Sequence, residues 1–129
     1  MNWRRESSLR TDLNGLQTMA APRNPDETQD RLAPLRPAYL RRLTMRRTEV
    51  AHAAATAAMR AFGEEELKEI HRTAHSMGSS AAIYGYARLS EAARAAERIL
   101  EDPASTPDAR TECLQCLARE AEAVLAQQH

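Results

Sequence analysis

The sequence predicts an all-α protein, an antiparallel up-down four-helix bundle with a short extra helix at its N-terminal side. Alanine, the strongest helix former, occupies 25 of the 129 positions. Aromatic residues make up only 4% of the chain, which disfavours strands. Apolar residues recur at helical spacing along four segments, and glycine- or proline-containing turns separate these segments. The length suits one domain of ordinary size.

The N-terminal region divides into a tail and the start of the domain. Residues 1–23 show no sustained apolar period, so we expect a mobile tail there and a bundle domain over 24–129. The sequence favours a short helix at the start of this domain, because Pro25 suits the first helical position and Asn24 and Glu27 suit a capping box. Prolines at positions 34 and 37 should end it.

The first two long helices are expected on either side of Gly63. The first should run from about Pro37 to Phe62, and Gly63 should end it in the left-handed conformation that glycine tolerates. Glu64–Glu66 then favour the positive N-terminal end of a second helix. Its apolar residues are spaced alternately three and four apart, as in a bundle seam, and are Leu67, Ile70, Ala74, Met77 and Ala81.

Two further helices follow Gly85, which should break the second one. The third is predicted over about 86–101. The fourth should open with Thr106 as its cap and Pro107 at its first position, and should end near Gln127. Because the loops between the helices are short, successive helices should run antiparallel.

Composition excludes several classes of function. Eighteen basic residues balance 18 acidic ones, which argues against a nucleic-acid binder. Four glycines form neither a Walker loop nor a GxGxxG motif, so no nucleotide site is expected. No apolar run is long enough to span a bilayer, and the N-terminus lacks the apolar core of a secretory signal. We therefore expect a cytoplasmic monomer that binds no membrane and keeps its two cysteines reduced.

His75 occupies an unusual position on the second helix. It lies about 100° around the helix from Ala74, at the border of core and solvent. The following turns on the same face carry only small side chains, at Gly78, Ser79 and Ala82, although a helical glycine costs about 1 kcal/mol relative to alanine. One interpretation is that this face gives a partner protein access to the imidazole. The alternative is that Gly78 permits close helix packing and His75 is an ordinary surface residue.

Glu97 is a candidate partner for this histidine. His75 lies ten residues before Gly85, and Glu97 lies twelve residues after it. In an antiparallel helix pair, residues at nearly equal distances from the turn lie side by side. A hydrogen bond from one ring nitrogen to Glu97 would fix the tautomer and leave the other nitrogen nucleophilic. Alternatively, Glu97 pairs with Arg94 or Arg98 on a solvated face.

The segment AHSMGSSAAIYGYARLSEAARAAERIL resembles the histidine-containing phosphotransfer (HPt) domains of bacterial phosphorelays. The residues that carry the resemblance are His75, Met77, the small residues 78–82, Gly85, Leu89 and Glu97. Two departures are plain. A lysine frequent in the family is replaced by Gly78, and the glycine after it by Ser79, which bears on the choice of partner.

The resemblance implies a phosphoryl carrier without enzymatic activity of its own. The imidazole of His75 would take a phosphoryl group from the aspartate of one receiver domain and pass it to another receiver, with Glu97 orienting the ring. Residues expected to face the receiver are Arg72, Gly78, Ser79 and Ala82. Arg72 would help to neutralise the phosphoryl charge, although a purely solvated arginine is the alternative.

The resemblance also implies the partners, namely response-regulator receiver domains and a hybrid histidine kinase. The Mg²⁺ that phosphoryl transfer needs would come from the receiver, so no cofactor and no metal of the chain's own are expected. We also expect the chain to lack any acidic metal-binding cluster near His75, which is consistent with that division of labour.

Two rival hypotheses compete with the phosphoryl carrier. His71 and His75 could bind zinc together with Cys113 and Cys116, but in an up-down bundle the second and fourth helices are diagonal, so their outer faces cannot meet at a metal. The second rival is a helical adaptor that binds a receiver or a kinase and transfers nothing.

Overall fold

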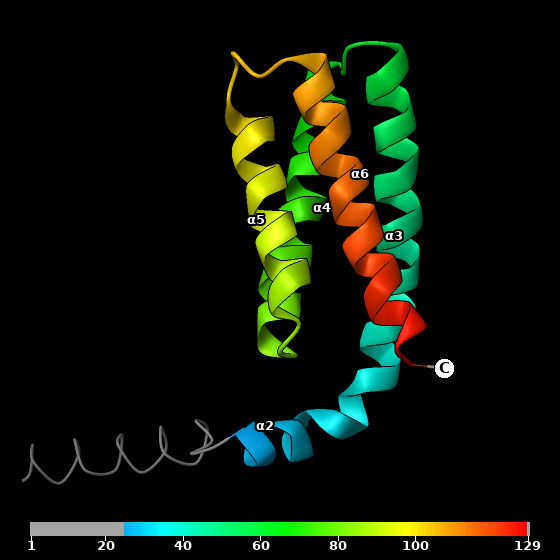
Figure 1. The fold of residues 1–129 in the computed structure, drawn as a ribbon, viewed down its shortest axis with the longest axis vertical. Coiled ribbons are helices and arrows are strands. Elements are labelled where there is room, and N and C mark those ends of the chain that lie inside the picture. The colour runs from blue at the N-terminus through cyan, green and yellow to red at the C-terminus, as the bar shows by residue number, and fades with distance from the viewer. Residues whose placement is uncertain (1–24, 129) are drawn as a thin grey trace, which may run out of the picture. The chain divides into compact units, whose positions relative to one another are not determined.

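The computed structural model describes residues 25–128, which are entirely helical apart from their turns (Figure 1). Its elements are α2 (Pro25–Leu32), the 3₁₀ helix η1 (Ala33–Leu35), α3 (Arg36–Met59), α4 (Glu64–Ile83), α5 (Ala87–Glu101) and α6 (Pro107–Ala126). The expected tail over 1–23 and the expected cap Asn24 lie outside the described residues. Helix α2 ends before Pro34, as predicted. A compact unit begins at Pro37, and the domain boundary that we expect at residue 24 stays a prediction.

The four long helices alternate in direction and pack as an antiparallel bundle, which confirms the predicted fold class (Figure 1). The closest backbone approaches join α4 to α5 and α5 to α6. An ion pair between Arg47 and Glu122 links α3 to α6. The stacked rings of Tyr39 and Tyr84, with centroids 4.2 Å apart, link α3 to the end of α4. No helix in the described part of the chain is both long and apolar enough to cross a membrane.

The core consists mainly of the apolar positions that helical spacing predicts. The apolar residues at helical spacing that are buried are Tyr39, Leu43, Val50, Ala54, Ala57, Ile70, Ala74, Met77, Ala81, Leu89, Ala93, Ala96, Leu100, Leu114, Leu117, Ala121 and Val124. Four further residues that follow the same spacing are only half-buried, namely Leu40, Leu67, Ala92 and Leu125. Because many of these side chains are alanine, neighbouring helices can approach closely.

The turn between α3 and α4 corrects the sequence-based prediction. Helix α3 ends at Met59 rather than Phe62, and Gly63 has φ −72° and ψ 169°, so it is extended and caps the start of α4. The reason is Glu66, whose Oε1 accepts a hydrogen bond from the Gly63 backbone N–H at 2.8 Å. Both terminal nitrogens of Arg60 bind the same carboxylate, at 2.8 and 2.7 Å.

The turn between α4 and α5 has the predicted glycine conformation. Gly85 has φ 83°, where a side chain would be strained. Its N–H donates to the carbonyl of Ala82 at 3.2 Å, and the N–H of Tyr86 donates to that of Ala81 at 2.9 Å. This is a Schellman motif, and it sets the register in which α5 returns along α4.

Gly78 lies where α4 meets α5. It is buried, and a Cβ placed there would lie 3.2 Å from the Cβ of Ala93. Ser90, also buried, donates a hydrogen bond from Oγ to the Gly78 carbonyl at 3.0 Å. Close packing of the two helices, one of the two interpretations left open by the sequence, is therefore the role that the structure gives this glycine.

Enlarging Gly78 should destabilise the bundle. We expect Gly78→Val to lower the free energy of unfolding by about 1–3 kcal/mol, because its methyl groups would overpack the contact with Ala93. Urea unfolding followed by circular dichroism measures this change. The control Ala82→Val changes an exposed position on the same helix and should stay within about 0.5 kcal/mol of the wild type. A wild-type midpoint for Gly78→Val would contradict the packing role.

The cap formed by Glu66 should give stability a distinct pH dependence. Hydrogen bonds from Arg60 and from the Gly63 N–H lower the pKa of Glu66 to about 2. A carboxyl whose pKa is lower in the folded state stabilises fully above its unfolded pKa, and this contribution is lost as the pH falls through the folded value. Glu66→Gln should therefore lower the melting temperature at pH 7, and the difference from wild type should shrink as the pH falls and vanish below about pH 2.

Glu64→Gln is the matched control, because Glu64 lies in the same helical turn but makes no hydrogen bond to Gly63. It should change the melting temperature less than Glu66→Gln does at pH 7. A difference between Glu66→Gln and wild type that persists unchanged at pH 2 would contradict the lowered pKa.

Candidate functional site

His75 and Glu97 face each other across α4 and α5. The distance from His75 Nδ1 to Glu97 Oε2 is 2.7 Å. The contact that we predicted from their similar sequence distances to Gly85 is therefore present. The imidazole is 66% exposed, whereas the Glu97 side chain is only 18% exposed. Neither Arg94 nor Arg98, the alternative partners of Glu97, forms an ion pair with it within residues 25–128.

This hydrogen bond determines which ring nitrogen of His75 is reactive. A carboxylate is an acceptor only, so Nδ1 carries the proton and donates it to Glu97. In the neutral ring Nε2 then carries the lone pair. The arrangement presents a nucleophilic nitrogen on an exposed side chain, and its orientation is set by a carboxylate that is mostly shielded from water.

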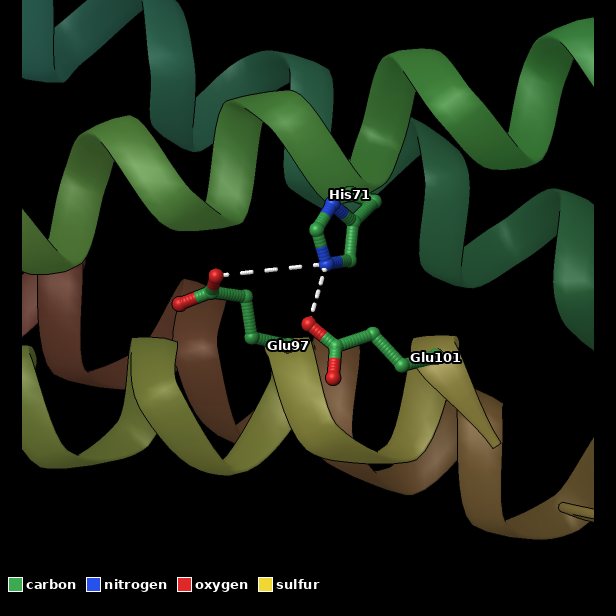
Figure 2. Close-up of side chains that lie close together, drawn as sticks. All are labelled: His71, Glu97 and Glu101. Carbon is green, nitrogen blue, oxygen red and sulfur yellow. Dashed lines mark hydrogen bonds and ion pairs between the residues drawn. The ribbon is translucent and has the colours of Figure 1, made fainter.

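His71 forms a second histidine–carboxylate pair one turn away. Its Nε2 lies 2.8 Å from Glu101 Oε2 and 3.9 Å from Glu97 Oε2 (Figure 2). We did not predict this pair, although His71 and Glu101 each lie four residues farther from the turn than His75 and Glu97 do. The same antiparallel register that joins the first pair therefore joins the second.

These contacts correct the expectation that no acidic metal-binding cluster lies near His75. One ligand atom each of His71, Glu97 and Glu101 lies within 4.8 Å of the other two (Figure 2). The cluster was missed because its histidine is on α4 and its two glutamates are on α5, and they meet only when α5 packs on α4.

The rival zinc site with the cysteines does not form. Cys113 and Cys116 are on α6, and they do not belong to the metal-ligand cluster found among the described residues. Burial raises the pKa of the Cys113 thiol to about 11, so at neutral pH this group is protonated and is a poor ligand.

The residues expected to face a receiver differ in their exposure to solvent. Ser79 and Ala82 are exposed on α4, as that role requires. Arg72 is also exposed, but its Nη1 is 2.9 Å from Glu69 Oε1. Gly78 is buried against α5, so it offers a partner little surface and acts chiefly through the packing of the two helices. Ile83, 59% exposed at the end of the same helix, was not predicted.

Two shallow depressions flank His75, and both are lined by His75 and Glu97. The larger, of about 620 Å³, extends past Lys68 and Arg72. The smaller, of about 320 Å³, extends over Gly78 and Ser79 to the basic residues Arg94 and Arg98 of α5. Basic side chains thus lie on both sides of the imidazole, an arrangement suited to an anionic group on the ring. The sequence did not indicate the contribution of α5, because the helix register decides which side chains flank the histidine.

Comparison with known protein families supplies the last observation. A model of the Hpt domain family matches residues 8–127, and this match begins inside the segment that we expect to be a tail. Separate comparisons with curated proteins and with solved structures gave no match. The family match spans nearly the whole chain, including all four helices of the bundle and both histidine–carboxylate pairs. The chain therefore belongs to the Hpt domain family, whose members act as phosphoryl carriers in phosphorelays.

Proposed function

We propose that His75 accepts a phosphoryl group from the aspartyl phosphate of one receiver domain and passes it to the aspartate of another. Membership of the Hpt family implies phosphotransfer in a phosphorelay and interaction with receiver domains and kinases. The observation that carries the more specific proposal is the 2.7 Å contact between His75 Nδ1 and Glu97, because it leaves Nε2 as the nucleophile on an exposed ring.

The chemistry follows from this tautomer. The lone pair of Nε2 attacks phosphorus while the bond from phosphorus to the aspartate oxygen breaks, which releases a carboxylate. The ring then carries a positive charge, and the proton on Nδ1 stays hydrogen-bonded to Glu97. The carboxylate stabilises the charge that develops during transfer and holds the ring in place. In the second step the neutral imidazole leaves as the next aspartate attacks.

The chain's own charges favour binding of the phosphoryl oxygens. Lys68 and Arg72 line one depression beside the ring, and Arg94 and Arg98 line the other. These four basic residues would supply only part of the charge stabilisation. Phosphoryl transfer relies on a metal ion and a lysine at the phosphate, and the partner would provide both. We propose that the receiver supplies the Mg²⁺ for transfer and that phosphoryl transfer requires no cofactor bound to this chain.

His71 is a poorer acceptor than His75 for two physical reasons. Its Nε2 is held by Glu101 at 2.8 Å, and its side chain is only 32% exposed. It also faces two carboxylates, Glu97 and Glu101, which would repel an incoming phosphoryl group. Exposure and charge therefore both favour His75.

The proposed docking surface is the exposed face of α4 that continues from His75 through Ser79 and Ala82 to Ile83. Small side chains on this face let the aspartyl phosphate come within reach of the ring. An apolar residue at its end, Ile83, adds area that a partner can bury. No lysine follows His75 on this face, so recognition would depend more on Arg72 and on the two arginines of α5.

Replacing the acceptor should abolish phosphorylation. We expect the wild-type chain to take up acid-labile phosphate from a phosphorylated receiver, and His75→Gln to take up none. Gel autoradiography or intact mass measures the uptake. His71→Gln is the matched control and should still be labelled. A wild-type chain that binds receivers but is never labelled would favour the adaptor alternative. Labelling of His75→Gln would show that another residue accepts the phosphoryl group.

Removing the carboxylate should slow transfer and disturb the tautomer. A hydrogen bond to a charged group contributes about 1.5–3 kcal/mol, so Glu97→Ala should reduce the transfer rate by roughly 10- to 100-fold. Nitrogen-15 NMR of the ring should show that the proton no longer favours Nδ1.

The control for Glu97→Ala is Glu91→Ala, which changes an exposed glutamate of α5 that does not contact His75. It should retain the wild-type rate and the wild-type ring spectrum. Wild-type transfer by Glu97→Ala, with an unchanged tautomer, would contradict the orienting role.

A further inference from the structure

We propose that His71, Glu97 and Glu101 form a binding site for a divalent transition-metal ion, and that Zn²⁺ is the ion their donor atoms suit. The site joins α4 to α5 (Figure 2). It shares Glu97 with His75, whose Nδ1 bonds the same carboxylate. It does not depend on the proposed phosphotransfer, since it requires only these three side chains and water.

The donor atoms are already close to the positions that zinc requires. Zinc bonds of about 2.0–2.2 Å in a tetrahedron place neighbouring ligand atoms about 3.3–3.5 Å apart. His71 Nε2 lies 2.8 Å from Glu101 Oε2 and 3.9 Å from Glu97 Oε2, and all three donor atoms lie within 4.8 Å of one another. These distances lie on either side of the tetrahedral spacing, so we expect rotations of the glutamate side chains to close the site.

The backbone that carries these residues is well held. Helices α4 and α5 pack closely at Gly78 and Ala93, and Ser90 adds a buried hydrogen bond between them. A site whose ligands come from both helices therefore keeps their spacing without the metal, which lowers the entropy lost on binding.

The surroundings leave room for the remaining ligand. Glu97 is 18% exposed and His71 32%, whereas Glu101 is 57% exposed and opens the cluster to solvent. The depression of about 620 Å³ lined by His71 and Glu97 gives an ion a path to the site. Three protein ligands with water in the fourth position make a common zinc arrangement.

The charge of the cluster independently points to a cation. No arginine or lysine within residues 25–128 forms an ion pair with either of its carboxylates, whose partners are imidazole rings, although Arg94 and Arg98 line a depression that both carboxylates share. The nearest basic side chains of α4 are paired elsewhere, Lys68 with Glu65 and Arg72 with Glu69. Two adjacent negative charges on a partly shielded surface attract a divalent ion, and its binding relieves their repulsion.

The mixture of donors favours a transition metal over Mg²⁺ or Ca²⁺. These two ions prefer oxygen ligands throughout, whereas an imidazole beside carboxylates suits divalent transition metals, of which zinc accepts both His and Glu ligands. Binding needs the His71 tautomer with its proton on Nδ1, so that Nε2 offers its lone pair. Glu101, which holds Nε2 in the metal-free state, then becomes a ligand beside it.

The shared carboxylate couples the metal to His75. A carboxylate bound to zinc is a weaker hydrogen-bond acceptor, because the ion withdraws electron density from it. The 2.7 Å bond from His75 Nδ1 should therefore weaken when zinc binds, although His75 is not a ligand. The NMR signals of the His75 ring should therefore change when the metal binds, although His75 contributes little to the affinity of the site for the metal.

Isothermal titration of the full chain with Zn²⁺ tests the site. We expect one zinc ion per wild-type chain, and His71→Gln and Glu101→Gln should each weaken binding by about tenfold or more. Two matched controls, His52→Gln and Glu91→Gln, change exposed residues outside the cluster and should alter the dissociation constant less than about twofold. Circular dichroism of every variant verifies that the bundle is folded.

Two further variants locate the ion. His75→Gln should keep the affinity within about threefold, and nitrogen-15 NMR of the wild type should show the largest zinc-induced change at His71 Nε2 with a smaller one at His75. A double variant, Cys113→Ser with Cys116→Ser, should bind as the wild type does.

The proposal would be overturned by the absence of saturable binding, by wild-type affinity in His71→Gln, or by loss of binding in the cysteine variant. No phosphoryl donor or receiver is present in these experiments. Their failure is therefore distinct from a failure of the phosphotransfer proposal.

Discussion

The close packing of α4 on α5 is the constraint on which the rest of the site depends. Gly78 provides it by carrying no side chain at the point where Ala93 approaches, and Ser90 reinforces it with a buried hydrogen bond to the Gly78 carbonyl. The Schellman turn at Gly85 then sets which residue of α5 lies opposite each residue of α4. Spacing and register together bring the carboxylate of Glu97 within hydrogen-bond distance of an exposed imidazole.

One register produces two histidine–carboxylate pairs with different chemical properties. In the pair near the turn, Nδ1 of His75 is bonded and the ring is largely exposed, which suits a nucleophile at Nε2. In the pair one helical turn away, Nε2 of His71 is bonded and two carboxylates surround it, which suits a cation better than a phosphoryl group. Glu97 belongs to both environments, so changes at either histidine reach the other through one side chain.

Local patterns predicted much of this protein because they reflect local physics. Thr106 and Pro107 begin α6 as expected, since the Thr106 Oγ1 accepts the free N–H of Ala109 at 3.0 Å. The prediction for Gly63 was wrong, because whether a glycine ends one helix or caps the next depends on the side chains around it. Here Glu66 and Arg60 decide the outcome, and their contacts depend on the path of the loop.

The sequence by itself determined the helical fold class and the order of the helices, and it indicated Glu97 as a candidate partner of His75, since helical period and antiparallel register follow from spacing along the chain. Only the tertiary structure decided that Gly78 serves packing and that arginines of α5 flank the ring. It also brought His71, Glu97 and Glu101 together. These features depend on the distances between helices. Side-chain volume and packing set these distances, and no pattern within a single helix encodes them.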